Sequence, residues 1–579
     1  MEWIKLLPET VILDNEGLSL EDVVHIVKND YQLKLSENVK EKVVLARKAI
    51  EKAVESGEKI YGITTGFGAL RDIVIPEKDA TKLQTNLIRS HCVGVGEPAR
   101  DDFVKAMMVL RVTALGQGYS GCQLKTLENL IQMINKNVLP IIPIKGSVGA
   151  SGDLAQLSHM VLAMIGEGEN NLKFEGKIYN AKEGMQKAGV PITKLSYKEG
   201  LALNNGSQYS AGIACIVLHE ASNLIKNAEI AAALSLEALK AASQQFDDRI
   251  HQARFHPGQI AVAKNLRSYT KGSVFVKKHE SLFTCEVENC GYYYDRKMGD
   301  ASQNVLPNTE FINLPDDWTC PNCGGSKDNF EKQWPKIQDD YSIRCTPQVL
   351  GPVRETLEHC WKTISREINA ATDNPLIFIT KKDPLEFDIY SGGNFHGEPI
   401  AMVMDYLSIA MAEVGNISER RCAKLIDDKR NDGLSLFLIP RSELGLNSGF
   451  MMPQYTAAAL VSENKVLAAP ASVDSIPTSD EAEDHVSMSP IAARKTAEIL
   501  ENLQYIIAIE MMLAVQAIDL RCDIQKIPHE KALGKDTLKA YKVIRESVSK
   551  LIHDRIIYPD INKIADLIKS GKIIVDITT

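Results

Sequence analysis

Two long segments without glycine or proline limit what this chain can fold into. Residues 213–256 and 491–527 contain neither breaker, and both are rich in strong helix formers such as alanine, leucine and glutamate. Their apolar residues recur with a helical period and cover nearly every side, which predicts long helices buried between neighbouring helices. Clear alternating strand patterns are scarce. We therefore expect a mainly α fold, built as a bundle of long helices.

Charge and hydropathy exclude several classes of protein. The 579 residues include 66 basic and 75 acidic side chains, a formal net charge of −9, whereas nucleic-acid binding needs a basic surface. The most apolar stretch is interrupted by Glu510, so we expect no membrane span. The start, MEWIKLLPET, lacks the basic and apolar regions of a secretory signal. We expect a cytoplasmic protein with neither a nucleic-acid nor a membrane partner.

Clustered cysteines predict a metal site. Four of the 11 cysteines form a Cys-x4-Cys pair and a Cys-x2-Cys pair separated by 29 residues, while the other seven are scattered singly. Two such turns can enclose a tetrahedral four-sulfur site, which suits zinc or a single iron. The expected ligands are Cys285, Cys290, Cys320 and Cys323.

A change in composition marks the segment around these cysteines as a separate unit. Residues 281–334 are rich in Gly, Asn, Asp, Pro and aromatic residues, and from Phe283 to Trp334 nine acidic and four basic side chains carry −5 of the net charge. We expect a small acidic insertion at 281–334 between two parts of a helical body, residues 1–280 and 335–579. Because so small a core is unstable alone, a metal would supply much of its folding free energy.

The sequence around the two cysteine pairs resembles that of rubredoxin, the one-iron electron carrier. The similar strings are CGYYYD after the first pair and LPDDWTCPNCGGSKDNFE around the second. The resemblance implies one iron at the four-cysteine site, with zinc as the alternative, and a redox partner if the module carries electrons. The chain departs from the family in the first pair, where four residues rather than two separate the cysteines.

A glycine-rich turn, KGSVGASGDLAQLSHM at residues 145–160, has two interpretations. It can be an ordinary helix start with Asp153 as the N-cap. Alternatively, the amide nitrogen of Gly152 attacks the carbonyl carbon of Ala150, and loss of two waters, one using the Ser151 hydroxyl, leaves a methylidene-imidazolone ring. Such a ring is an electrophile, which the standard side chains do not supply.

Ten strings spread along the body favour the second interpretation, because together they resemble the histidine and aromatic amino-acid ammonia-lyases. They appear in that family's order, as YGITTGFG, LQTNLIRSH, GSVGASGDLAQLSH, LALNNGSQ, QDDYSIRCTPQVLG, TDNPL, SGGNFHGEP, GNISERR, LNSGFMMPQYTAAALVSENK and ASVDSIPTSDEAEDHVSM. The resemblance implies non-oxidative elimination of ammonia from a small amino acid through the methylidene-imidazolone. It also implies a helix bundle of the ammonia-lyase and aspartase-like type, and a homotetramer whose subunits share active sites.

The same resemblance implies roles for individual residues. Tyr61 would take the β-proton of the substrate, and Arg344 would bind its carboxylate. Asn205, Gln338 and Tyr341 would support the ring and the substrate amine. Two further residues complete the expected catalytic set: Phe395, packed against the electrophile, and Glu483, near the substrate ring as a base or an imidazole partner.

Few residues bear on the identity of the substrate. Ser90 and His91 match the histidine-specific pattern of the family, which implies conversion of L-histidine to urocanate and ammonia. Three departures from the family pattern keep a 2,3-aminomutase, or a lyase for another aromatic amino acid, open as alternatives: Asn204, Gln156 and Ala469. An electron-transfer protein on a degenerate lyase scaffold is a third hypothesis. The intact Ala-Ser-Gly triad, Tyr61 and Arg344 speak against it.

The position of the insertion suggests a regulatory role. It ends a few residues before Gln338, Tyr341 and Arg344, so a metal-dependent fold there can order or disorder the segment that carries them. We hypothesise that the insertion couples activity to iron supply or redox state. A tolerated surface insertion without influence on turnover is the alternative.

Overall fold

The computed structural model describes residues 10–56, 59–66, 68, 72–76, 79–278, 282–333 and 338–574. Helices dominate these residues, which confirms the prediction of a mainly α chain. The chain divides into two compact units. The first comprises Met1–His219, Glu358–Ser408 and Ala468–Glu498, and the second Glu220–Leu357, Ile409–Leu467 and Ile499–Thr579.

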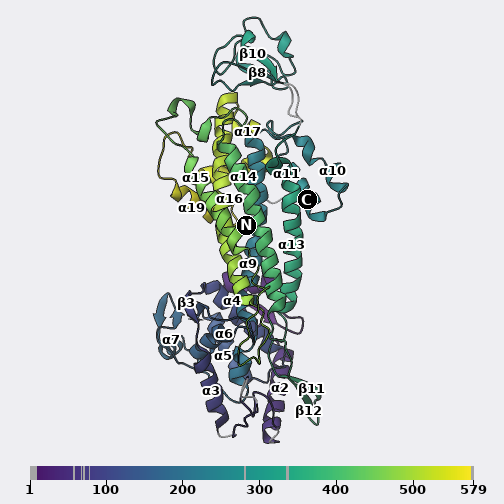
Figure 1. The fold of residues 1–579 in the computed structure, drawn as a ribbon, viewed down its shortest axis with the longest axis vertical. Coiled ribbons are helices and arrows are strands. Elements are labelled where there is room, and N and C mark those ends of the chain that lie inside the picture. The colour runs from purple at the N-terminus through teal and green to yellow at the C-terminus, as the bar shows by residue number, and fades with distance from the viewer. Residues whose placement is uncertain are drawn as a thin grey trace. The chain divides into compact units, whose positions relative to one another are not determined.

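Four long helices are the main elements of the fold (Figure 1): α9 (Gln208–Ala238), α13 (Thr346–Glu367), α14 (Glu398–Ile426) and α16 (Ser489–Gln525). Helices α9 and α16 arise from the two segments without glycine or proline. The first of those segments does not stay helical throughout, because Lys240 adopts a positive φ of 49° and the chain turns there. A 3-10 turn at Ser243–Phe246 and the short helix α10 (Asp248–Gln252) follow.

Two of these helices are long and apolar enough, by length and composition, to cross a membrane. In α16, however, 94% of the apolar window is buried inside the structure, and in α14 the buried share is 61%. The nearly complete burial of α16 is typical of the core helix of a folded protein.

Short helices and strands make up much of the first unit. Helix α1 shows how they begin: the Ser19 side chain accepts from the Asp22 N–H, and Asp22 accepts from the Ser19 N–H, a capping box. The helices are α1 (Leu20–Lys28), α2 (Glu37–Glu55), α3 (Ala80–His91), α4 (Asp101–Gly116), α5 (Leu124–Asn135), α6 (Leu154–Met164), α7 (Ala181–Lys187) and α8 (Glu199–Asn204).

The strands of the first unit form small sheets. Strands β1 (Thr10–Leu13) and β2 (Gln32–Leu35) pair in parallel, and the other pairs are antiparallel. Those others are β3 (Val95–Pro98) with β5 (Pro143–Lys145), β6 (Leu172–Phe174) between β4 (Leu139–Pro140) and β7 (Lys177–Tyr179), and β11 (Leu376–Lys381) with β12 (Glu386–Tyr390).

The second unit contains the remaining helices and the cysteine-rich segment. Its shorter helices are α11 (Pro257–Tyr269), α12 (Tyr341–Arg344), α15 (Met451–Leu467), α17 (His529–Ala532), α18 (Lys535–Ser547) and α19 (Tyr558–Lys569). The cysteine-rich segment forms one antiparallel sheet in which β8 (Leu282–Cys285) lies between β10 (Phe330–Gln333) and β9 (Tyr293–Tyr294). Figure 1 shows β8 and β10 side by side.

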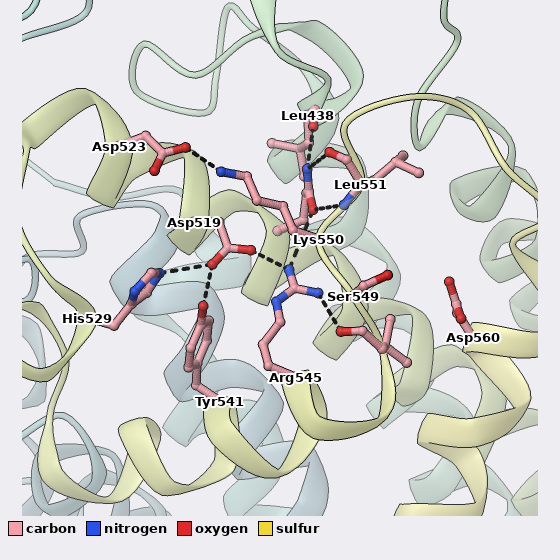
Figure 2. Close-up of polar contacts among 12 residues, drawn as sticks. Leu438, Asp519, Asp523, His529, Tyr541, Arg545, Ser549, Lys550, Leu551 and Asp560 are labelled. Carbon is pink, nitrogen blue, oxygen red and sulfur yellow. Dashed lines mark hydrogen bonds and ion pairs between the residues drawn. The ribbon is translucent and has the colours of Figure 1, made fainter.

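A buried carboxylate joins the end of α16 to the C-terminal helices (Figure 2). Asp519 accepts from Arg545 over 2.6 Å, from the Tyr541 hydroxyl and, over 2.9 Å, pairs with the His529 ring. Burial tends to raise the pKa of Asp519, but the hydrogen bonds and the Arg545 charge outweigh it and lower that pKa. Nearby, Gln516 donates to the carbonyl groups of Leu438 and Leu551.

Candidate active site and metal centre

One cavity in the first unit collects side chains from distant parts of the sequence. Its volume is about 1010 Å³, and its walls come from the segment 59–75, helices α3, α6 and α8, and the loops that precede α14 and α16. Seven of the predicted site residues line it: Tyr61, Ser90, His91, Ser151, Asn205, Phe395 and Glu483. The fold therefore brings most of the predicted lyase site into one cavity.

The turn before α6 has a geometry that only glycine can adopt at position 152. Gly152 has a φ of +77°, and a Cβ built on it would lie 2.2 Å from the carbonyl oxygen of Gly206. The two glycines form a bridge, and the Asp153 N–H donates to the Gly206 carbonyl over 2.7 Å. The backbone of Ala150-Ser151-Gly152 is thus held in a tight bend.

Two neighbours fix Ser151 inside this bend. The Asn205 amide donates to the Ser151 carbonyl over 2.9 Å, and the Ser151 hydroxyl donates to the Glu483 carboxylate. The second oxygen of Glu483 accepts from the Thr478 hydroxyl over 3.0 Å. These contacts fit a Ser151 whose side chain and backbone take part in forming a ring, because carbonyl and hydroxyl are both held.

Asp153 is fully buried directly after the triad. Its two oxygens accept from the N–H and the hydroxyl of Ser210, each over 2.8 Å. Burial raises the pKa of Asp153 to about 7, against the opposing effect of these hydrogen bonds. Asp153 precedes α6, as the simple N-cap interpretation expects. Its side chain makes no capping hydrogen bond to α6, however, and accepts from Ser210 instead.

Tyr61 and His91 face the cavity from different elements. The Tyr61 hydroxyl oxygen accepts from the Gly68 N–H over 3.3 Å. His91 ends α3, with its Nδ1 at 3.0 Å from the Ser90 hydroxyl. Burial lowers the pKa of His91, against smaller effects of the Leu87 carbonyl and Glu483, so the ring is uncharged near neutral pH. An uncharged imidazole can both donate and accept a hydrogen bond.

The four clustered cysteines meet as predicted. Their ligand atoms lie within 4.8 Å of one another, with sulfur–sulfur distances of 3.6 Å for Cys285–Cys323 and 3.4 Å for Cys290–Cys320. A tetrahedral ion with bonds of about 2.3 Å needs sulfurs about 3.8 Å apart, so a small opening accommodates zinc or iron. Of the four, only Cys323 is exposed.

An aromatic cluster surrounds this site and forms a core of its own. Tyr292, Tyr294, Phe311, Trp318 and Phe330 are buried together. The Trp318 indole also donates to Asp300 over 2.9 Å. The rings Tyr294 and Trp318 meet edge to face, with centroids 5.7 Å apart.

The cysteine-rich segment also packs against the helical part of the second unit. Tyr293 is 5% exposed, and its ring lies 4.5 Å from the Lys240 ammonium and 5.8 Å from that of Lys277. Lys277 also forms an ion pair with Asp295. Asn289, inside the Cys-x4-Cys turn, accepts from Arg441 over 2.5 Å. The longer first turn is therefore part of the contact with the helices.

Comparisons with known proteins indicate the same enzyme family as the residues that line the cavity. The family model for aromatic amino acid lyases matches residues 18–546. The chain is 43% identical over 563 residues to histidine ammonia-lyase of Caldanaerobacter subterraneus subsp. tengcongensis, covering 97% of each.

The chain belongs to the aromatic amino acid lyase family.

Solved structures give the same result for this lyase family member. Histidine ammonia-lyase from Trypanosoma cruzi superposes with a TM-score of 0.79 at 35% identity, over 97% of this chain and 94% of that one. Tyrosine aminomutase from Streptomyces globisporus superposes with a TM-score of 0.82 at 32% identity, over 98% and 99%. Membership confirms the prediction of an ammonia-lyase-type enzyme with a bundle of long helices.

Three residues of the predicted lyase site belong to the second unit. Gln338, Tyr341 and Arg344 are absent from the described residues that line the cavity. Tyr341 is 70% exposed, and the Arg344 guanidinium lies over its ring at 4.6 Å. Within the first unit, the cavity therefore brings together Ser151 of the triad, Tyr61, Ser90 and His91.

The departures from the family pattern are placed as follows. Asn204 lines the cavity, and its amide donates to the Ser158 hydroxyl over 3.1 Å. Gln156 is buried and donates to the Pro143 carbonyl over 3.3 Å. The Ala469 carbonyl accepts from Lys495. Only Asn204 of these three therefore faces the site.

Sequence reasoning missed several polar wall residues, of which Asn374 and Ser391 contact each other. Asn374 and Ser391 also line the cavity, and the Asn374 amide donates to the Ser391 hydroxyl over 3.1 Å. The strings TDNPL and SGGNFHGEP contain them, so membership in those strings was the available signal.

Proposed function

We propose that this lyase removes ammonia from L-histidine and releases urocanate. The observation that carries the proposal is that His91, Glu483, Ser151 and Tyr61 all line one cavity. His91 and Glu483 can exchange hydrogen bonds with an imidazole. The histidine ammonia-lyases among the relatives support the same substrate.

The residues of the triad fit a methylidene-imidazolone. The tight bend at Gly152, the held Ser151 carbonyl and the buried Ala150 are what cyclisation of this backbone requires. When present, the group supplies an electrophile for the substrate amine. Asn205 then orients the backbone of the triad, and Phe395 packs at its side of the cavity.

Proton transfer falls to the chain's own side chains. Tyr61 is the base for the β-proton in this proposal, and the Gly68 N–H fixes where its oxygen lies. His91 and Ser90 bind the substrate imidazole, with Glu483 as its second partner.

Ultraviolet absorbance tests the substrate. Purified protein incubated with L-histidine is expected to accumulate urocanate, while L-tyrosine and L-phenylalanine give no cinnamate-type product. His91→Leu removes one hydrogen-bonding group, and the selectivity for histidine should fall by about 10- to 100-fold. The aminomutases among the structural neighbours favour a second candidate, a 2,3-aminomutase. A β-amino acid formed without urocanate would establish that candidate.

We also propose a homotetramer in which Gln338, Tyr341 and Arg344 complete the cavity of another copy. Two observations support it: the high exposure of Tyr341, and exposed apolar side chains on α14 and α15. Those side chains are Met402, Tyr406, Ile409, Met452, Tyr455 and Val466. Closed symmetric assembly would bury them.

Complementation between inactive variants tests the shared site. Ser151→Ala and Arg344→Ala should each abolish turnover alone. Because a mixed site can take Ser151 from one chain and Arg344 from another, coexpression should restore about a quarter of the sites. No recovery in mixed tetramers would show that each chain builds its own site.

The cysteine-rich segment is, in our proposal, a rubredoxin-like module with one iron at Cys285, Cys290, Cys320 and Cys323. The four-sulfur geometry and the aromatic core support it, and zinc is the alternative occupant. A redox partner would approach the exposed Cys323. Metal analysis and the visible spectrum of the purified protein distinguish the two metals, since only iron bound to thiolates is coloured.

Contacts at the base of the module support a regulatory role. Lys277, which binds Tyr293 and Asp295 of the module, also accepts through its carbonyl from the Ser243 N–H over 3.1 Å. The adjacent Ala242 N–H donates to the Asp339 carboxylate over 2.8 Å. Asp339 stands two residues before Tyr341, so the module and the segment that carries Tyr341 and Arg344 share one support.

Removal of the module tests this role. A variant in which a short linker replaces residues 283–334 should bind histidine more weakly and lose any dependence on iron or oxidants. Unchanged kinetic constants would make the module a tolerated insertion instead.

A further inference from the structure

Two imidazole rings outside the cavity lining come together from different loops of the first unit. His396 lies in the loop before α14 and His485 in the loop before α16. Nε2 of His396 lies 3.4 Å from Nδ1 of His485. The rings are stacked at an interplanar angle of 28°, with centroids 5.5 Å apart. The two nitrogens meet hydrogen-bond geometry, and a metal ion bound to both would take the place of that hydrogen bond.

The separation of the two nitrogens suits a shared metal ion. Zinc binds imidazole nitrogen at about 2.0–2.1 Å with tetrahedral angles, which places two nitrogen ligands about 3.4 Å apart. Imidazole is a ligand for zinc and other transition metals and a poor one for calcium or magnesium.

A third side chain supplies negative charge. Glu398 begins α14, and its Oε2 lies 4.0 Å from Nδ1 of His396. This oxygen is buried and has no hydrogen-bond partner among the residues that the structure describes. One ligand atom from each of the three residues lies within 4.8 Å of the others. A buried carboxylate oxygen without a hydrogen bond is costly, and a cation held by the two imidazoles would offset that cost.

We propose that His396, Glu398 and His485 bind one divalent transition-metal ion of the zinc type. The ion would link two loops that also carry cavity residues: Phe395 is adjacent to His396, and Glu483 lies two positions before His485. Metal binding therefore holds one wall of the cavity to another. The site is separate from the four-cysteine cluster and does not depend on which amino acid is the substrate.

Calorimetric titration with zinc tests the site. Full-length protein that has first received one equivalent of zinc for the thiolates is titrated with further Zn²⁺, and the wild type is compared with His485→Gln. We expect the wild type to take up one more equivalent per chain than the variant. Glu398→Gln should keep the stoichiometry but bind about 10- to 100-fold more weakly.

Two controls make the result specific. His553 also contacts a carboxylate, Glu443, at 3.2 Å, and His553→Gln should bind as the wild type does. Cys323→Ser should affect only the thiolate equivalent. Zinc should also slow proteolysis within the loop 468–488 of the wild type and not of His485→Gln. Equal stoichiometry in the wild type and His485→Gln, with no weakening in Glu398→Gln, would overturn the proposal.

Discussion

Tyr293 is the residue whose removal best tests how the cysteine-rich module is held. Its ring is 5% exposed and lies near two ammonium groups, those of Lys240 and Lys277. Truncating a buried aromatic ring costs about 3 kcal/mol or more, and each cation–π contact adds about 0.5–1 kcal/mol. Tyr293→Ala should therefore weaken docking of the module by about 4 kcal/mol.

A loss of this size changes the population of undocked molecules by roughly 1000-fold. Limited proteolysis measures it directly, because undocking uncovers the chain around Tyr293, Lys240 and Lys277. We expect Tyr293→Ala to be cut far faster than the wild type, while its metal spectrum stays unchanged. Tyr293→Phe keeps the ring near both cations and should behave as the wild type does. Ile312→Ala, at an apolar position of the module that is 82% exposed, is the matched control.

The same variant separates docking from regulation. If undocking loosens the support that Lys277 and Asp339 share, the Michaelis constant for histidine should rise in Tyr293→Ala. Proteolysis no faster than in Ile312→Ala would refute the docking argument. Fast proteolysis with unchanged kinetics would refute only the regulatory link.

Three further perturbations test the active site and the core. Gly152→Ala should abolish both turnover and the absorbance of the methylidene-imidazolone, because the new Cβ would lie 2.2 Å from the Gly206 carbonyl oxygen. The control is Gly176→Ala: Gly176 has a similar φ of +72° but nothing within 4 Å of its Cβ position, so this variant should lose only about 1 kcal/mol of stability. The pKa of Asp153 is raised to about 7, so the folded protein keeps the Asp153 proton at pH values where the unfolded chain has lost it. The free energy of unfolding of the wild type should therefore fall by roughly 1.4 kcal/mol per pH unit between about pH 4 and 7. Urea unfolding of Asp153→Asn should lack this pH dependence. The pKa of Asp519 is lowered, so its stabilisation is complete above about pH 4 and is lost as the pH falls toward the folded pKa; Asp519→Asn should lose about 3 kcal/mol at pH 7 and show less acid destabilisation.

Local sequence was sufficient to predict two of the long helices and the meeting of the four clustered cysteines. Helices α9 and α16 follow from segments without breakers, because propensity and apolar periodicity act within a few turns. The cyclisation interpretation of residues 145–160 needs a tightly bent backbone, and Gly149 and Gly152 both have a positive φ. The sequence did not indicate that α9 ends at Ala238, because the chain turns at Lys240, a non-glycine residue with a positive φ.

Only the tertiary structure decided which distant groups meet. Glu483, in the loop before α16, accepts a hydrogen bond from Ser151, and the Tyr293 ring lies near the ammonium groups of Lys240 and Lys277. No spacing in the sequence links these residues. His396 and His485 lie 89 positions apart, and each alone looks like an ordinary polar loop residue. Such pairs depend on how helices pack, and packing is fixed by the summed burial of side chains along the whole chain rather than by any local pattern.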